Sequence, residues 1–350
     1  MKEFTIAKEE AGQRLHKYLA RLLPNAGTGF TYKMLRKKNI TLNHSRAEGS
    51  EMLSPGDVVT VFFSDETFAK MSGAGAASVA RYSERPLTEE QIVYEDEHLM
   101  AVFKPAGVLS QKDDSGLESL NEQALQYLMD RGNLTEETVR RFKPGICNRL
   151  DRNTAGIVWF AKTLAGAQGM AEVLRNRNVE KYYFAFVAGI LTKSADVTLY
   201  LTKDEATNTV TVSKDARDGA SVIHTGVWPV VSSKRATLVR IRLYTGKSHQ
   251  IRSVMKYLGF PVLGDPKYMP EDKDIVAYYR TRYHLHGQQL FAYAYRFPDD
   301  LPESLSELAG ETITGLVPDA FAELLAGELP ANQEGNHGYL EIPRTSGIPV

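Results

Sequence analysis

Apolar residues near the start of the chain recur at the spacing of an α-helix. Leu15, Leu19 and Leu22 lie on one helical face, a pattern typical of an amphipathic helix packed on a core. A second short helix is predicted over residues 32–37. Two short runs of strand-forming residues follow, separated by turns rich in Pro and Gly. The pattern predicts a compact α/β domain over residues 1–63.

This periodicity is lost over residues 64–90, where Gly, Ala and Ser become frequent. Such a composition predicts a flexible linker. The string GAGAAS within it neither follows a strand pattern nor opens a helix pattern, so it does not predict a phosphate-binding loop.

Residues 91–298 combine strand and helix patterns. Strands are predicted in IVYEDEHLMAVFKPAGV, VEKYYFAFVAGIL and ATLVRIRLYTG, and helices over residues 119–131, 164–176 and 247–259. We therefore expect a chain of the α+β class, in which a small amino-terminal domain precedes a larger mixed domain rich in strands.

Charge is distributed unevenly along the chain. Residues 1–63 hold ten Lys or Arg against six Asp or Glu, whereas residues 299–350 hold one Arg against ten acidic residues. The net charge of -1 therefore hides a basic amino-terminal domain and an acidic carboxyl-terminal extension. Within this extension one amphipathic helix is predicted, over residues 319–325. A positive field can steer a protein toward phosphate groups.

Composition excludes several other classes. The apolar fraction of 43% is that of a globular protein, and no apolar run is long enough to cross a bilayer. The first residues include acidic side chains and lack the apolar segment of a secretory signal. Cys147 is the single cysteine, which excludes an internal disulfide and fits a reducing compartment. We expect a cytoplasmic protein without membrane association.

The stretch NRLDRNTAGIVWFAKT carries the strongest chemical signal. Asp151 lies between Arg149 and Arg152, just before a run of strand-forming residues. A carboxylate fixed on a loop beside cations can act as a nucleophile or as an electrostatic stabiliser. Taken alone, the same triplet is also typical of a loop ion-pair cluster.

This stretch resembles the catalytic signature of the RluA-type pseudouridine synthases, written HRLDxxTSG. In that family the aspartate attacks a uridine in RNA. The resemblance implies that Asp151 is catalytic and that Arg149 fills the space left by a flipped-out uridine. The chain departs from the signature at Asn148, in place of His, and at Ala155, in place of Ser.

Two further segments carry the same resemblance. KYYFAFVAG is similar to the family's KxYxAxVxG strand, which leaves Tyr182 at a variable position. The resemblance implies that Tyr183 is the catalytic tyrosine that stacks near the target base and takes part in proton transfer. TGKSHQIRSVMKYLGFPVLGDPKY is similar to TGRTHQIRxHLxxxGxPxxGDxxY, which assigns Arg252 as the partner of the catalytic aspartate. A guanidinium can stabilise and orient a carboxylate. Lys247 and Ser248 replace the family's Arg and Thr, and Lys247 is expected to contact RNA.

The amino-terminal segments GQRLHKYLARLLP, LRKKNITLN and LSPGDVV resemble an S4-type RNA-binding domain. One departure is His16, where that family more often has Asp. Members present basic helices to folded RNA, which implies RNA contacts for Arg14, Lys17, Arg36, Lys37 and Lys38. The alternative is an ordinary α/β domain with solvated basic faces.

No metal or cofactor is predicted. The histidines that could suggest a metal site lack acidic or cysteine residues at ligand spacing; they are His224, His249, His284 and His286. Isomerisation of uridine involves neither redox change nor phosphate transfer, so the resemblance implies no nucleotide or organic cofactor.

The resemblance implies an RNA pseudouridine synthase whose larger domain is a largely antiparallel sheet with flanking helices. Large-subunit ribosomal RNA is the first expected target and tRNA the second, and no obligatory protein partner is inferred. Two alternatives stay open. One is a non-catalytic RNA-binding or ribosome assembly factor with the same S4-like domain. The other is a carbohydrate hydrolase, although no second catalytic acid is marked by these motifs.

Overall fold

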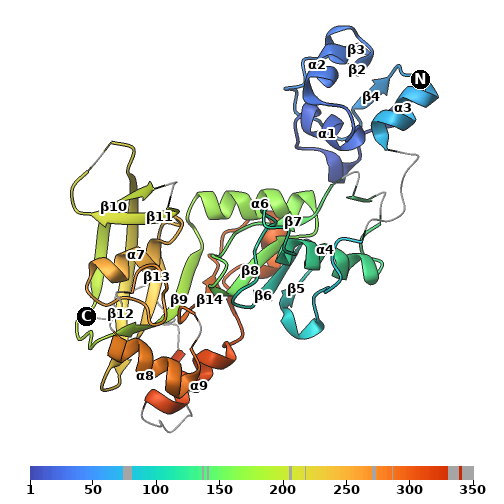
Figure 1. Ribbon diagram of the computed structural model, residues 1–350. Helices are drawn as coiled ribbons and strands as arrows, with labels where there is room; N and C mark the ends of the chain where they lie inside the picture. Colours follow the sequence, from blue (N-terminus) through green and yellow to red (C-terminus); the bar gives the residue numbers. More distant parts are fainter. Residues whose placement is uncertain are drawn as a thin grey trace.

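Two β-sheets organise the chain, a small one at the amino end and a large one in the rest. Figure 1 shows the amino-terminal unit, in blue, standing out from one end of a body built around the large sheet. The computed structural model describes residues 1–73, 81–135, 138–139, 142–204, 207–216, 218–269, 273–285, 287–329 and 339–340. Within these ranges, none of the helices has the length and apolar character needed to cross a membrane.

The amino-terminal unit, residues 1–73, is a four-stranded antiparallel sheet covered by helices. The strand order is β1 (Lys2–Thr5), β4 (Val58–Val61), β2 (Ile40–Leu42) and β3 (Ser45–Arg46). Three helical segments pack on it, which are η1 (Lys8–Glu10), α1 (Leu15–Leu22) and α2 (Thr28–Arg36). Leu15 and Leu19 are completely buried in its core, as their helical spacing predicts.

The first part of the predicted linker is also a helix of this unit. Helix α3 (Asp65–Ser72) begins at Ser64, whose side chain accepts a hydrogen bond from a first-turn amide, a common helix-starting signal. Phe68 on its inner face is buried in the core of the unit. The expectation of a flexible linker over residues 64–90 is therefore wrong for this helix. Residues 74–80 lie outside the described part of the chain.

The body contains one sheet that is mixed and largely antiparallel. Its path runs β11, β10, β12, β13, β9, β14, β8, β6, β5, with β15 paired to β14 and β7 to β8. Among these, β14 and β8 run parallel and the other neighbours antiparallel. The predicted α+β class is therefore confirmed. The strands are β5 (Ile92–Glu95), β6 (Leu99–Lys104), β7 (Gly145–Ile146), β8 (Ala155–Ala161), β9 (Glu180–Ala188), β10 (Ala195–Asp204), β11 (Thr209–Ser213), β12 (Ser221–Ser232), β13 (Ala236–Leu243), β14 (Leu290–Arg296) and β15 (Thr312–Thr314).

Helices cover both faces of this sheet. Helices α4 and α7 pack on one face, and α6, α8 and α9 pack on the other. A hydrogen bond of 2.6 Å from the Gln168 side chain on α6 to the Gly12 carbonyl joins the body to the amino-terminal unit. The helical segments of the body are η2 (Glu89–Gln91), α4 (Leu120–Asp130), α6 (Leu164–Arg175), α7 (Gln250–Tyr257), α8 (Lys273–Tyr283), η3 (Glu303–Leu308) and α9 (Asp319–Glu328).

Much of the predicted acidic extension belongs to the body. Strand β15 extends the sheet, and η3 and α9 bury apolar side chains that include Leu305 and Phe321. Three tyrosine hydroxyls of α8 donate to Glu328 at the end of α9. Residue 298 is therefore not a boundary of the fold, because the apolar positions that follow complete its core. Residues 330–338 and 341–350 lie outside the described ranges.

A glycine at the start of β8 permits the close approach of β14. Gly156 has a φ of +119°, and a Cβ on it would lie 2.2 Å from the carbonyl oxygen of Ala292. Only glycine tolerates both this conformation and this contact. The glycine of the NRLDRNTAG stretch thus allows the parallel pairing that places the preceding loop at the middle of the sheet.

Candidate active site

A cavity of about 590 Å³ opens on the body, and all three of the motif segments reach it. Three segments form much of its wall, over residues 109–113, 148–152 and 246–252, the last of which includes the first residues of α7. Tyr183 on β9 and Tyr295 on β14 also line the cavity. Residues from distant parts of the sequence therefore meet at one concave site, the usual form of a ligand-binding site.

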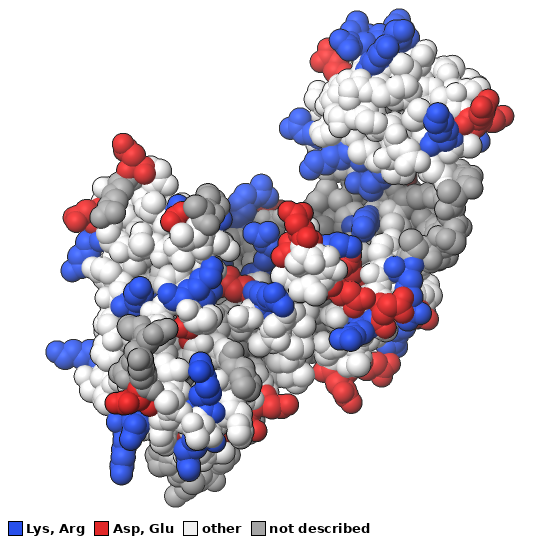
Figure 2. Space-filling view, in the orientation of Figure 1, with Lys and Arg blue, Asp and Glu red and all other residues white. Residues whose placement is uncertain are grey.

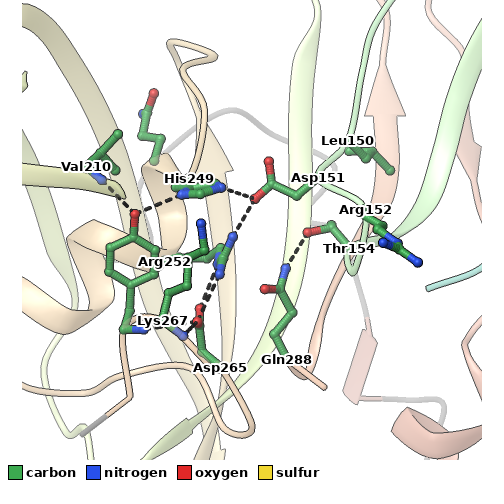
Figure 3. A network of polar contacts seen from close by, with 12 residues as sticks. Leu150, Asp151, Arg152, Thr154, Val210, His249, Arg252, Asp265, Lys267 and Gln288 are labelled. Atoms are coloured by element: carbon green, nitrogen blue, oxygen red, sulfur yellow. Dashed lines mark hydrogen bonds and ion pairs between the residues drawn. The ribbon is translucent and has the colours of Figure 1, made fainter. Parts of the chain in front are cut away.

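Arg252 joins two carboxylates at this cavity (Figure 3). Its NH1 group donates to Oδ2 of Asp151 at 3.0 Å, across 101 positions of sequence. Its Nε and NH2 groups donate to the two oxygens of Asp265 at 2.7 and 2.9 Å. Burial by itself lowers the pKa of Arg252, but hydrogen bonds and charge from Asp265, and then from Asp151, raise it above its usual value. The Arg252 guanidinium is thus permanently charged, and its hydrogen bonds to Asp265 fix its orientation toward Asp151.

The two carboxylates differ in exposure. The side chain of Asp265 is fully buried, whereas that of Asp151 is 26% exposed at the cavity. Within the described residues, the hydrogen bond from Arg252 engages Oδ2 of Asp151, and Oδ1 has no protein partner. Asp265 is therefore suited to hold Arg252, and Asp151 to present a free oxygen to a bound molecule.

The adjacent arginines do not form the ion-pair cluster that the triplet alone allows. In the described ranges, neither Arg149 nor Arg152 pairs with Asp151. Arg152 instead donates through Nε to the Gly107 carbonyl at 3.0 Å, and Arg149 is exposed on the cavity wall.

The loop that carries Asp151 is held by buried polar contacts. The ammonium group of Lys104, completely buried, donates to the carbonyls of Pro105, Val108 and Arg152 at 2.8–3.0 Å. Burial lowers the pKa of Lys104 to about 7, while the charge of Asp151 acts in the opposite direction. Because these contacts tie the turn at residues 105–108 to the backbone of Arg152, next to Asp151, the Asp151 side chain starts from a fixed position.

His249 is the second side chain that contacts the Asp151 carboxylate. Its Nδ1 lies 2.8 Å from the Tyr268 hydroxyl, which accepts a hydrogen bond from the Val210 amide. Its Nε2 lies 3.8 Å from Oδ2 of Asp151. Because the Tyr268 oxygen accepts from Val210, its hydroxyl group can donate to Nδ1 of His249. The proton of neutral His249 is then on Nε2, the nitrogen that faces Asp151. Burial is the main cause of the lowered pKa of His249.

Sequence reasoning did not assign roles to Asp265, Tyr268 or His249. All three lie within the TGKSHQIRSVMKYLGFPVLGDPKY segment that carried the resemblance. The polar residues of HQIR and GDPKY were a usable signal, since buried charged and polar groups require partners. Their mutual contacts depend on how α7 and the following turn fold over β11.

Tyr183 lies on the cavity wall and is 7% exposed. Burial raises the pKa of its phenol well above the ordinary value. Tyr182 faces the other side of the sheet and donates to Glu180, so the structure separates the two neighbouring tyrosines.

The two residues that depart from the family signature, Ala155 and Asn148, also fit into the fold. Ala155 is buried in an apolar cluster, and Asn148 hydrogen-bonds to protein groups.

The predicted RNA-contacting residues fall into two groups. Arg149 and Lys247 are exposed at the cavity. The other five are exposed on the amino-terminal unit, away from the cavity wall; they are Arg14, Lys17, Arg36, Lys37 and Lys38. Figure 2 shows Lys and Arg side chains both on this unit and around the hollow of the body beside it.

The described part of the chain holds no cluster of three or more His, Cys, Asp or Glu side chains that could bind a metal ion. His249 contacts Asp151 and Tyr268, and His224 contacts Asp196. His286, which the sequence also offered as a candidate, lies outside the described residues.

Comparison with known proteins assigns the family. Residues 98–257 match the RNA pseudouridylate synthase family. Over 264 residues the chain is 30% identical to the ribosomal large subunit pseudouridine synthase C of Vibrio cholerae, covering 75% of this chain and 79% of that protein. It is also 30% identical over 272 residues to an uncharacterised RNA pseudouridine synthase of Mycoplasma pneumoniae, covering 76% and 80%. The chain belongs to the RNA pseudouridylate synthase family, and within it to the RluA type.

A solved structure shares the fold. Human RNA pseudouridylate synthase domain containing 1 superposes with a TM-score of 0.51 at 20% identity, covering 71% of this chain and 94% of that one. Membership makes the chain an isomerase that acts on RNA, which is the reaction class that the motifs implied. The assignment of an S4-like domain stays a prediction.

Proposed function

We propose that this protein converts uridines of large-subunit ribosomal RNA to pseudouridine, with Asp151 as the catalytic residue. One observation carries the assignment of Asp151. Its carboxylate stands at the wall of the cavity with one oxygen held by Arg252 and the other without a protein partner in the described residues. A nucleophile or base needs this combination of fixed direction and a free oxygen.

The chemistry then proceeds without a cofactor. Asp151 drives cleavage of the bond between uracil N1 and ribose C1′, either by attack at C1′ or through a glycal. The bonding electrons leave with the uracil, which turns and forms a new bond from C5 to C1′. In the first route the ester bond between Asp151 and C1′ breaks as this bond forms; in the second route Asp151 removes a proton from C2′ and returns it there. The hydrogen on C5 is lost as a proton, and N1 gains one. Atoms and electrons balance within the substrate and water, and we expect the purified chain to act alone.

The target uridine must leave its base stack to enter such a cavity. We propose that Arg149 occupies the space that it vacates and that Lys247 contacts a neighbouring phosphate. Both are exposed at the cavity rim. A volume of about 590 Å³ is within the range of sites for small organic molecules.

Two lines of support favour ribosomal RNA as the substrate. Relatives at 27–30% identity carry the name ribosomal large subunit pseudouridine synthase C. The exposed basic residues of the amino-terminal unit suit contacts with the phosphates of a large folded RNA. We assign this unit to RNA binding as an S4-like domain and place the protein in the cytoplasm. tRNA is the second candidate.

Release of tritium tests the reaction directly. RNA transcribed with 5-³H-uridine loses its label only if C5 becomes bonded to C1′. We expect release from large-subunit ribosomal RNA by the purified protein without added metal or nucleotide. No release from any folded RNA, together with tight RNA binding, would identify the non-catalytic assembly factor instead. Sequencing for pseudouridine with and without the gene then locates the position.

The basic cluster at the carboxyl-terminal end of α2, residues 36–38, is expected to contribute RNA affinity without sequence specificity. In a Lys37→Glu, Lys38→Glu double variant we expect weaker binding to all folded RNAs. The slope of log affinity against log salt should fall by about 2, since each phosphate that is no longer neutralised lowers it by about 1. A matched control is Lys193→Glu, Lys234→Glu, which makes the same charge change at exposed positions of the body. Equal effects of the two double variants would contradict a specific role for the amino-terminal unit.

A further inference from the structure

One positively charged side chain on the cavity wall has no counterion in the fold. Lys181 on β9 lies two positions before Tyr183, on the same face of the strand, and both side chains line the cavity. The Lys181 side chain is partly buried. It forms no hydrogen bond and no ion pair with any residue in the described part of the chain. The proposed reaction gives this side chain no role.

The residues next to Lys181 offer it no negative charge. Its neighbours on the adjoining strands are Leu243 on β13 and Tyr295 on β14. The adjacent Glu180 lies on the opposite face of the sheet, because side chains alternate along a strand. On that face the Glu180 carboxylate pairs with Arg242 at 2.7 Å. The acid that is nearest in sequence is therefore already paired, on the wrong side of the sheet.

The charges around Lys181 are consistent with this isolation. Burial lowers the pKa of Lys181, and the positive charge of Arg177 lowers it further. The charge of Asp151 acts on the pKa of Lys104 and of Arg252. Neither Asp151 nor another carboxylate acts in this way on Lys181. A partly buried ammonium without a counterion costs free energy, a cost that proteins carry where a charge serves a ligand.

The ammonium of Lys181 lies beside the loop that precedes α7. A Cβ built on Gly246 would be 3.7 Å from the Lys181 Nζ atom, so the ammonium is close to the backbone of this glycine. The next residue, Lys247, is exposed at the same cavity. Two lysines from separate parts of the sequence therefore bring positive charge to one part of the cavity wall, where an anionic ligand is favoured.

We propose that Lys181 binds a phosphate of the RNA backbone next to the target uridine and so anchors the flipped nucleotide in the cavity. The inference rests on the proposed function, in which the uridine enters beside Asp151. RNA carries one negative charge on each phosphate, which supplies the counterion that the fold lacks. Two residues of a strand span about 7 Å, so one nucleotide can place its base near Tyr183 and its phosphate beside Lys181.

The position of Lys181 favours a phosphate over the other anion that the reaction forms, the detached uracil. Its Nζ atom lies beside Gly246, which is exposed, and the charge of Asp151 does not act on its pKa. The uracil, by contrast, separates from the C1′ atom that Asp151 reaches. An ammonium at the exposed edge of the site is suited to the RNA backbone, which stays outside the reacting centre.

Lys181→Met tests the proposal, because it keeps an unbranched side chain and removes the charge. We expect the affinity for large-subunit ribosomal RNA to fall about 10-fold, the effect of one charge-assisted hydrogen bond. The slope of log affinity against log salt should fall by about 1, as for one lost phosphate contact. The loss should appear in the affinity, measured by filter binding, far more than in the single-turnover rate of tritium release at saturating RNA.

The stability of the RNA-free protein gives an independent measurement. Removing a charge that has no partner leaves no other charge uncompensated. The Lys181→Met protein should therefore unfold at the same urea concentration as the unaltered protein or at a higher one. A less stable variant would show that Lys181 has a structural partner, and the proposal would then be wrong.

Two further variants serve as controls. Lys181→Arg keeps the positive charge and should restore the salt slope and most of the affinity. Lys193→Met makes the same chemical change as Lys181→Met at an exposed position of the body, and it should match the unaltered protein in every measurement. Full affinity and an unchanged salt slope for Lys181→Met would overturn the proposal, because water in the cavity would then suffice for the ammonium. Full affinity with slow single turnover would also overturn it and would assign Lys181 to the detached uracil.

The outcomes separate this inference from the function on which it rests. An unaltered protein that forms no pseudouridine refutes the proposed function. An active protein whose Lys181→Met variant binds RNA with the same affinity and salt slope as the unaltered protein refutes the phosphate contact alone.

Discussion

An Asp151→Asn variant is expected to form pseudouridine at least about 1000-fold more slowly than the unaltered protein, a loss typical of removing a catalytic nucleophile. The amide has nearly the same shape and still accepts the hydrogen bond that Arg252 donates at 3.0 Å. It lacks the negative charge that attack at C1′ or proton abstraction requires. Single-turnover tritium release measures the rate, and filter binding with the same RNA measures an affinity that should be unchanged.

The matched control for this variant is Asp114→Asn, which makes the same chemical change on an exposed loop. That variant should keep the full rate. Turnover of the Asp151→Asn protein within a few-fold of the unaltered rate would show that the carboxylate is not the catalytic group. The whole assignment of the site would then be lost.

Arg252→Met is expected to lower both stability and activity. The side chain of Asp265 is fully buried and has its bidentate partner in Arg252. Removing one member of a buried ion pair costs about 3–5 kcal/mol, because the remaining charge is left without compensation. Asp151 also loses the donor that sets its direction. Urea denaturation measures the first effect and tritium release measures the second.

A double variant separates these two effects. Adding Asp265→Asn to Arg252→Met removes the uncompensated charge, so much of the stability should return while the activity stays lost. Arg252→Lys keeps the charge without the planar fork and should fall between the native and Met proteins in both measurements. An active, fully stable Arg252→Met protein would contradict the arrangement drawn in Figure 3.

Local sequence patterns predicted helices and strands correctly where the pattern lay within a single element. The apolar spacing of Leu15 and Leu19 predicted α1, and the strand and helix patterns of the body predicted β9, β13, α6 and α7 to within a few residues. Helix α3 was missed because the interpretation followed the Gly, Ala and Ser content of the surrounding segment. The two residues that indicate this helix, the N-cap Ser64 and the apolar Phe68, gave a weaker signal than the Gly, Ala and Ser content did.

The carboxyl-terminal region shows a different limit. Its acidic composition predicted an appended extension, yet β15 and α9 are part of the body. Whether Phe321 is buried depends on the apolar surface that Phe186 and Phe291 present to it. That surface exists only after β9 and β14 have paired.

The sequence by itself determined the family, the reaction class and the three residues proposed for the chemistry, Asp151, Tyr183 and Arg252. It could do so because each lies in a contiguous motif whose residue types are set by the reaction. Only the tertiary structure decided that Asp265 holds Arg252, that Lys104 bonds to the backbone beside Asp151 and that Tyr295 holds Asn148. The contact between Tyr295 and Asn148 requires β14, late in the chain, to lie beside β8, a neighbourhood that no local periodicity encodes.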